Sequence, residues 1–506
     1  MVNKIVKLED LKEISFSLKQ EGNKIIHCHG VFDLLHIGHI KHFAEAKKKG
    51  DILIVTLTSD EFVNKGPNRP AFKISHRLES ISSLEDVDYV AENKWPTAEK
   101  TIQIIKPDIY FKGPDYKENE KDVTGNIKKE ISSLKKYGGK IEYSKSITFS
   151  SSNLINKYSD LYNEDQKNFL KEISNNFDEN DFQESFKKFS DLKILVIGET
   201  IIDQYIFCEA IGKSGKEPML VLRELESNNY LGGAAAVANH LSEFSNNISF
   251  LTCIGQANTL SDFISNNLNK KIKAKYLKKK DAPTVLKKRF IDKVSGNKTL
   301  GVYSLNDENL QPPQETVVLN HLKDIKKYDL VIVADYGHGF ITKKIANFIS
   351  KTSPFLSLNA QINSSNSGFH SLNKYSKCDS IIINESELRH EMRSRQGDLK
   401  KLMLKLSQNH RANYVVVTRG SKGSLLFNNK KNEFIECPAF ASKLVDKVGS
   451  GDAMLPILSM SLKSKLKDNI SLWFGSLAAA QSVESISNSK YVDKTEMLKT
   501  IQHALK

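Results

Sequence analysis

Residues 27–42, HCHGVFDLLHIGHIKH, decide how the first part of this chain is interpreted. The stretch contains five histidines, and two of them, His36 and His39, form the pattern His-x-Gly-His. It starts in an apolar run, Gly30 permits close backbone approach, and a helix is expected to begin near Gly38. Because the N–H groups and the positive dipole end of a helix start favour phosphate, both histidines are expected to donate to an anion. Zinc ligands and ordinary core histidines are the alternatives, and neither HExxH spacing nor a cysteine pair supports zinc.

Strands and helices are expected to alternate around this stretch. Apolar runs at residues 24–33, 50–60, 87–92, 108–113 and 140–144 predict strands, with helix-like segments between them. This spacing is typical of a doubly wound parallel sheet, which predicts a first α/β domain over residues 1–158. Residues 159–190 are polar and helix-forming and predict a helical linker. A second alternating pattern predicts another α/β domain over residues 191–506.

Composition narrows the class of protein. The chain has 506 residues, 39% of them hydrophobic, which suggests two or three globular domains. No run approaches eighteen apolar residues and the first residues lack a secretory core, so no membrane association is expected. The five cysteines are scattered, which fits a reduced cytoplasmic protein. The net charge of +14 comes from short lysine runs without interleaved aromatics, so we expect phosphorylated small molecules as partners and no nucleic acid.

Polar residues at the ends of apolar runs mark a second site in residues 191–506. Asp203 ends the run that begins this half, and Gly232 and Gly233 lead into a helix of small residues where a polar substrate can lie against backbone. Lys287 and Arg289 alternate along an expected strand, which suits a phosphorylated substrate. These residues are predicted to bind the substrate.

The stretch DKVGSGDAML, residues 446–455, is the most informative part of this half. Gly449, Ser450 and Gly451 can direct backbone N–H groups at a transferring phosphoryl group, which leaves Asp452 to accept the proton of a substrate hydroxyl. Asn384 and Glu387 stand three residues apart at a strand end, a spacing suited to organising Mg²⁺ through its water shell. A glycine-rich turn followed by an Asp helix cap is the alternative for the first motif.

The first half resembles the HxGH nucleotidyltransferases of the cytidylyltransferase-like group in four ordered blocks. Besides the opening motif, these are VNKGPNRPAFKISHRLE, PDIYFKGPDY and ITFSSSNLINK. The resemblance implies that His36, His39 and Lys65 bind the transferring and leaving phosphates. It implies nucleotide or phosphate contacts for the following residues: Gly30, Val31, Phe32, Arg77, Lys112, Asp115, Ser150, Ser151 and Ser152. A sugar phosphate would attack ATP or CTP and release pyrophosphate, with Mg²⁺ bridging the phosphates.

The second half resembles the ribokinase-like, PfkB-type carbohydrate kinases. The resemblance implies that Asp452 is the general base, that residues 449–451 form the anion hole, and that Thr418 and Gly420 lie along the ATP cleft. Residues 205–230 and 283–305 are expected to form a β-lid over the sugar. In this family the lid is often also a dimer surface, so a homodimer is expected.

Together the two halves are similar to the bifunctional heptose enzymes of ADP-heptose synthesis, with their order reversed. The resemblance implies ATP-dependent phosphorylation of a heptose 7-phosphate at C1. A separate phosphatase then removes the 7-phosphate, and nucleotidyl transfer to the remaining 1-phosphate gives an activated sugar for surface glycans. Two features depart from the pattern: Ala236 stands where an Asn is expected, and Asn359, Gln361 and Asn363 follow where Asp-Pro-Lys is common. A CDP-activating enzyme for another sugar or polyol phosphate, and a regulatory protein with decayed sites, are the alternatives.

Overall fold

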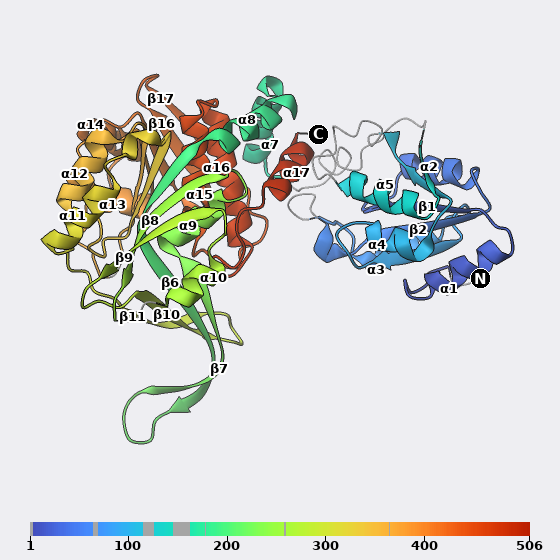
Figure 1. Ribbon diagram of the computed structural model, residues 1–506, viewed down its shortest axis with the longest axis horizontal. Coiled ribbons are helices and arrows are strands. Elements are labelled where there is room, and N and C mark those ends of the chain that lie inside the picture. Colours follow the sequence, from blue (N-terminus) through green and yellow to red (C-terminus); the bar gives the residue numbers. More distant parts are fainter. Residues whose placement is uncertain are drawn as a thin grey trace. The chain divides into compact units, whose positions relative to one another are not determined.

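The computed structural model describes residues 4–63, 69–114, 126–144, 162–177, 179–257, 260–363 and 365–505. The chain divides into two compact units, residues 1–170 with 495–506, and residues 171–494. Figure 1 shows a parallel sheet flanked by helices in the first unit and a larger sheet in the second. The domain boundaries at residues 158 and 190 stay predictions.

The first unit is a five-stranded parallel sheet in the order β3-β2-β1-β4-β5. Its strands are β1 (Ile25–Gly30), β2 (Ile52–Thr58), β3 (Tyr89–Asn93), β4 (Ile109–Lys112) and β5 (Lys140–Tyr143). Its helices are α1 (Leu11–Gln20), α2 (Ile37–Lys47), α3 (Ile74–Ser82), α4 (Glu99–Ile105) and α5 (Asn126–Lys136). The strand order reverses direction between β1 and β4, and ligands of such sheets bind at that point, beyond the carboxyl ends of the strands.

Alternating side chains of β1 cover the two faces of this sheet. Ile26 and Cys28 belong to a core with Phe43 of α2, whereas Ile25 packs in a separate core with Leu11 of α1. Both faces of the sheet therefore carry an apolar core, as in a parallel sheet covered on both sides. The expected doubly wound arrangement is confirmed.

The second unit is organised around β6 (Lys193–Lys213). The first part of β6 pairs in parallel with β8 (Asn247–Gly255) and β12 (Leu330–Asp335). The main sheet continues through β13 (Leu356–Ala360), β14 (Ser380–Asn384) and β15 (Tyr414–Thr418) to antiparallel β16 (Ser424–Asn428) and β17 (Glu433–Cys437). Beyond β8 lies parallel β9 (Ile272–Lys279).

Helices cover both faces of the main sheet. One core joins strand residues such as Leu195 and Val331 to α11 (Pro312–His321), α12 (Lys343–Thr352) and α14 (Leu399–His410). The other face carries α9 (Gly233–Leu241), α15 (Ser450–Lys463) and α16 (Asp468–Val483). On that face Ser357 of β13 hydrogen-bonds Ser459 of α15 at 2.6 Å.

The far part of β6 leaves the main sheet and builds a lid. It pairs antiparallel with β7 (Leu220–Gly232) and in parallel with β10 (Val285–Asp292), which in turn pairs with β11 (Lys298–Ser304). In Figure 1 the β6–β7 hairpin extends well away from the helices. The β-lid expected at residues 205–230 and 283–305 is confirmed.

Two further helices, α7 (Glu164–Asn176) and α8 (Glu179–Asp191), occupy the stretch expected to be a helical linker. In α8, Phe186 stacks on Phe474 of α16 with ring centroids 5.4 Å apart. The remaining helices are α10 (Ser261–Asn267), α13 (Glu385–Glu391) and α17 (Lys494–Ala504). None of the helices in the described ranges combines the length and apolar character needed to cross a bilayer.

Candidate active sites

The first candidate site lies at the reversal point of the five-stranded sheet, between the end of β1 and the start of α2. Phe32 has a left-handed backbone with φ of 48°, and its ring lies where a Cβ on Gly30 would come within 2.9 Å. A side chain at Gly30 would therefore collide with Phe32. This tight turn delivers the chain to the N-terminus of α2, where the positive end of the helix dipole favours an anion.

His36 is the N-cap of α2, and its Nδ1 accepts the N–H of Gly38 at 3.0 Å. The His36 and His39 rings are stacked, with centroids 3.9 Å apart and an angle of 22° between their planes. Burial lowers the pKa of His36, so its imidazole is neutral near pH 7 without a bound anion. The structure thus brings the two histidines of the motif together at a helix start.

The other three histidines of the opening stretch have buried partners. His27 Nε2 and His29 Nδ1 lie 2.8 and 3.0 Å from the Thr56 hydroxyl, and His42 packs against Phe111. Burial lowers the pKa of all three, of His29 to about 3 and of His42 to about 4. Within the described ranges, no group of three or more His, Cys, Asp or Glu side chains is arranged to hold a metal ion.

Arg77 on α3, predicted to contact phosphate, is almost fully buried and is held by protein atoms. Its guanidinium donates to the carbonyl oxygens of Phe72, Val31 and Thr58 and to the Asp60 carboxylate, at 2.5 to 2.9 Å. These bonds join α3 to the turn after β1 and to the end of β2. The contacts show that Arg77 holds these segments together, and its phosphate role stays a prediction.

Lys112 ends β4, next to β1, and its Nζ lies 3.4 Å from Glu130 of α5. It also lies 4.9 Å from the Tyr110 ring centroid. The remaining residues predicted for this site, Lys65, Asp115, Ser150, Ser151 and Ser152, lie outside the described residues. The described part of the site therefore consists of the β1–α2 turn with the carboxyl end of β4 beside it.

The second candidate site begins where β6 leaves the main sheet for the lid. Asp203 is paired in register with Lys287 of β10, and its carboxylate accepts a hydrogen bond from Arg289. A Cβ on Gly232 would lie 2.4 Å from Asp203 Oδ2, so only glycine fits there. A Cβ on Gly233, at φ of 61°, would lie 2.6 Å from a backbone oxygen, which favours glycine there too.

Lys287 and Arg289, predicted to bind a phosphorylated substrate together, have different partners. The guanidinium of Arg289 is committed to Asp203. The Lys287 ammonium lies 5.7 and 5.9 Å from the ring centroids of Tyr303 and Tyr336. Burial lowers the pKa of Lys287, and the nearby Asp203 opposes that shift. Among the described residues, Lys287 is therefore a buried cation without a carboxylate at ion-pair distance, while Arg289 fixes the Asp203 carboxylate.

Asp452 lies in the first turn of α15, directly after the glycine-rich turn. Gly449 is the N-cap with φ of 95°, and a Cβ there would come within 2.4 Å of Asn488 Oδ1. Burial raises the pKa of Asp452 to about 6, and nearby Asp203 adds to this shift. Ser450 and Gly451 complete the first turn of the helix, whose free N–H groups suit a phosphoryl group.

Asn384 and Glu387 stand at the end of β14 and the start of α13. Asn384 Oδ1 accepts the N–H of Glu387 at 2.9 Å, and Glu387 Oε2 accepts the N–H of Asn384 at 2.8 Å. Their spacing of three is thus also that of a capping box. Asn384 is in register with Thr418 at the end of β15, and Gly420 follows with φ of 60°. The structure brings these four predicted residues to one edge of the sheet.

Sequence reasoning missed Tyr336, which follows β12, and Asn488, which lies after α16. The Tyr336 hydroxyl donates to Asp452 Oδ1 at 2.7 Å, and Asn488 Nδ2 lies 3.5 Å from Oδ2. Tyr336 stands directly after a buried strand, where functional residues of such sheets collect, and that position was a usable signal. The sequence near Asn488 carries no such signal.

The two units define the class of protein: a Rossmann-like, HxGH nucleotidyltransferase-type unit that precedes a ribokinase-like unit with a lid. The cytidylyltransferase-like family model matches residues 27–157, and the model of the pfkB family carbohydrate kinases matches residues 191–494. The second match spans more than half of the chain. The chain therefore belongs to the pfkB family of carbohydrate kinases, and its order of units is the reverse of the standard one.

Curated relatives are similar to part of the chain, and a solved structure shares the fold of one part. "Bifunctional protein HldE" of a Nitratiruptor species is 43% identical over 126 residues, 24% of this chain and 27% of that protein. The protein of the same name from Geobacter metallireducens is 34% identical over 168 residues, 32% of each chain. The chain spans about a third or less of the relatives it matches. Escherichia coli phosphofructokinase-2 in complex with substrates and products shares the fold, with a TM-score of 0.51 at 15% identity over 62% of this chain and all of that one.

Proposed function

We propose that the chain is a bifunctional enzyme of nucleotide-sugar synthesis, in which the second unit phosphorylates a heptose 7-phosphate at C1. The observation that carries this proposal is the position of the Asp452 carboxylate. It lies at the start of α15 behind a left-handed glycine, with Asp203 and Lys287 among the charged groups that face it. A buried base with a cation and an anion-binding helix start beside it suits phosphoryl transfer to a hydroxyl.

In the proposed reaction the sugar hydroxyl oxygen attacks the γ-phosphorus of ATP, its proton passes to Asp452, and ADP leaves. The pKa of Asp452, about 6, suits a base that is ionised at neutral pH and still takes a proton readily. Gly449, Ser450 and Gly451 would receive the transferring phosphoryl group. Lys287 would bind substrate phosphate, and Asp203 with Gly232 and Gly233 would bind sugar hydroxyls.

Mg²⁺ is proposed to accompany the nucleotide beside Asn384 and Glu387. Mg²⁺ usually keeps several waters and binds one or two carboxylates together with substrate phosphates. Glu387 fits such a role because it is a buried carboxylate whose pKa burial raises to about 7, so a nearby cation would favour its ionised form. When bound, the ion would neutralise charge on the phosphates. Thr418 and Gly420 would line the ATP cleft.

The first unit is proposed to transfer a nucleotidyl group to the sugar 1-phosphate. A phosphate oxygen of the sugar attacks the α-phosphorus of the nucleoside triphosphate, and pyrophosphate leaves, so no protein nucleophile is needed. The stacked His36 and His39 support this proposal because they stand at the N-terminus of α2, where the phosphates would be held. Lys65 and Lys112 would add positive charge. ATP as the donor gives ADP-heptose, and CTP gives the alternative CDP-sugar.

Two further proposals concern assembly and location. The lid strands expose large apolar side chains, among them Ile211, Leu220, Leu300 and Val302, and this supports a homodimer formed through the lid. All five cysteines are free and buried, which supports a reducing compartment such as the cytoplasm.

Mass spectrometry of the products formed from a panel of sugar phosphates with each nucleoside triphosphate tests the proposal. Heptose 7-phosphate with ATP is expected to give a bisphosphate, and heptose 1-phosphate with ATP is expected to give ADP-heptose and pyrophosphate. Asp452→Asn should lower only the kinase rate, by about 10²- to 10⁴-fold, and His39→Ala should abolish only the transferase. Loss of both activities in either variant would overturn the two-site model, and ligand binding without turnover would favour the regulatory alternative.

A further inference from the structure

Tyr336 connects the loops at the carboxyl ends of β12 and β13 to the predicted base. The side chain is buried, and its hydroxyl donates to Asp452 Oδ1 at 2.7 Å. We infer that Tyr336 is a positioning residue that orients the Asp452 carboxylate, and that the amides of Asn363 and Asn366, in the loop after β13, hold Tyr336 in place. This inference rests on the proposed role of Asp452 as general base.

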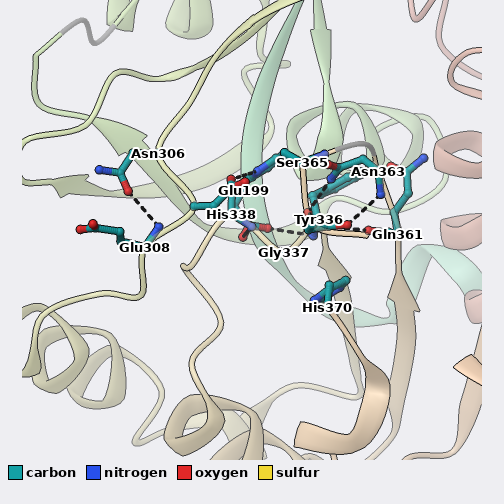
Figure 2. Close-up of polar contacts among 12 residues, drawn as sticks. Glu199, Asn306, Glu308, Tyr336, Gly337, His338, Gln361, Asn363, Ser365 and His370 are labelled. Atoms are coloured by element: carbon teal, nitrogen blue, oxygen red, sulfur yellow. Dashed lines mark hydrogen bonds and ion pairs between the residues drawn. The ribbon is translucent and has the colours of Figure 1, made fainter. Parts of the chain in front are cut away.

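The backbone of Tyr336 is fixed from both sides. Its N–H donates to Glu199 Oε2 at 3.1 Å, and the other oxygen of Glu199 accepts the N–H of His338, also at 3.1 Å. Its carbonyl oxygen accepts the Nδ2 amides of Asn363 and Asn366 at 3.0 and 2.7 Å. Figure 2 shows Glu199 and Asn363 on either side of Tyr336. A residue held at both its N–H and its C=O can direct its side chain with little freedom.

The residues that supply these amides are themselves joined by short polar contacts. Asn366 Oδ1 accepts the N–H of Asn363 at 2.8 Å, and Asn363 Oδ1 accepts the N–H of Ser365 at 2.9 Å. Gly337 has φ of 70°, and a Cβ there would lie 2.4 Å from Asn366 Nδ2. The loop and the turn after Tyr336 therefore fit each other closely. Asn363 departs from the usual Asp-Pro-Lys pattern. Its contacts give it a structural role, so this departure does not indicate a decayed site.

The two oxygens of Asp452 are held unequally. Oδ1 accepts the short Tyr336 bond, whereas the contact of Oδ2 with Asn488 Nδ2 is longer, at 3.5 Å. Among the charged groups facing the carboxylate, Asp203 of β6 raises its pKa and Lys287 of β10 lowers it. The carboxylate in turn raises the pKa of Glu387 of α13. Tyr336 thus fixes one oxygen and leaves Oδ2 available for the proton of the substrate hydroxyl.

Removing only the Tyr336 hydroxyl tests the inference. Tyr336→Phe keeps the buried ring but takes a hydrogen bond from the ionised carboxylate, so the pKa of Asp452 should rise. The acid limb of the kinase pH–rate profile, near pH 6 in the natural chain, should move upward by about one unit, a tenfold change in proton affinity. Above that limb, kcat should fall about tenfold because the base is less well oriented, with KM for ATP unchanged.

Tyr375→Phe is the matched control. Tyr375 is also buried, and its hydroxyl donates to the Asp335 carboxylate at 2.6 Å, so the substitution removes the same kind of bond. We expect a similar loss of stability in both variants and a shifted acid limb in Tyr336→Phe alone. The rates are measured with heptose 7-phosphate, or with the panel sugar phosphate that gives product, over pH 5 to 9.

The outcomes separate the inference from the proposed function. If Asp452→Asn keeps its kinase activity, the proposed base is wrong and the inference falls with it. If Asp452→Asn is inactive while Tyr336→Phe keeps the natural profile and kcat, only the inference is overturned. The double variant Asn363→Ala/Asn366→Ala should lower kcat like Tyr336→Phe, because it releases the Tyr336 carbonyl. An unchanged kcat in that variant would contradict the claim that these two amides hold Tyr336 in place.

Discussion

Lys298 on lid strand β11 lies 2.5 Å from the carboxylate of Asp446, three residues before Gly449. The same carboxylate accepts the Tyr205 hydroxyl at 2.5 Å and the N–H groups of Val448 and Ser487, each at 3.1 Å. Burial opposes ionisation of Asp446, but these bonds outweigh it and hold its pKa below the ordinary value. One carboxylate therefore joins the lid to the turn that begins α15.

Removing the Lys298 ammonium should weaken this connection. For Lys298→Met we expect a threefold to tenfold lower kinase kcat/KM, on the order of 1 kcal/mol, mainly through KM for the sugar phosphate, because the lid would close less well. Stability should fall by less than about 1 kcal/mol, because Lys298 is partly exposed. Lys293→Met, at an exposed lysine of the same lid, is the control, and equal effects of the two substitutions would contradict a specific connection.

The left-handed turn at Gly449 should not tolerate a side chain. Gly449→Ala forces φ of 95° on alanine and places a Cβ 2.4 Å from Asn488 Oδ1. We expect a loss of about 1–3 kcal/mol in the free energy of unfolding and a kinase rate at least tenfold lower. Gly451→Ala serves as a stability control, because a Cβ there meets no atom of the described chain within 4 Å. Equal unfolding midpoints of the two variants in urea would contradict the strain argument.

Substitution of Arg77 distinguishes a structural role of its side chain from a role in binding phosphate. Arg77→Met leaves three carbonyl oxygens and the Asp60 carboxylate without their donor, which should cost about 2–4 kcal/mol in the first unit. Hydrogen–deuterium exchange should show faster exchange in α3 and β2, with the second unit unchanged. Lys73→Met, at an exposed residue just before α3, is the control. Unchanged exchange with a raised KM for the nucleotide would instead indicate a phosphate contact.

Local patterns were sufficient for the fold and for the two motif-bearing helix starts. Strand-like runs separated by helical segments predicted both doubly wound sheets. The lid, where β6, β7, β10 and β11 lie, was implied by the resemblance to the PfkB-type kinases. The HxGH and GSGD motifs each sit at the start of a helix, because a capping residue and a glycine act within a few positions along the chain.

Only the tertiary structure decided which polar side chains are free to bind a substrate and which are paired with other protein groups. Arg289 is committed to Asp203, 86 residues away, whereas Lys287, two residues from Arg289, has no carboxylate of the described residues at ion-pair distance. Tyr336 reaches Asp452 across 116 residues, and its carbonyl is held by amides from a loop that departs from the family pattern. Such pairings depend on where strands end in space. The sequence alone therefore determined the sheets and the helix starts. Packing determined which charged side chains of each site are paired within the protein and which are not.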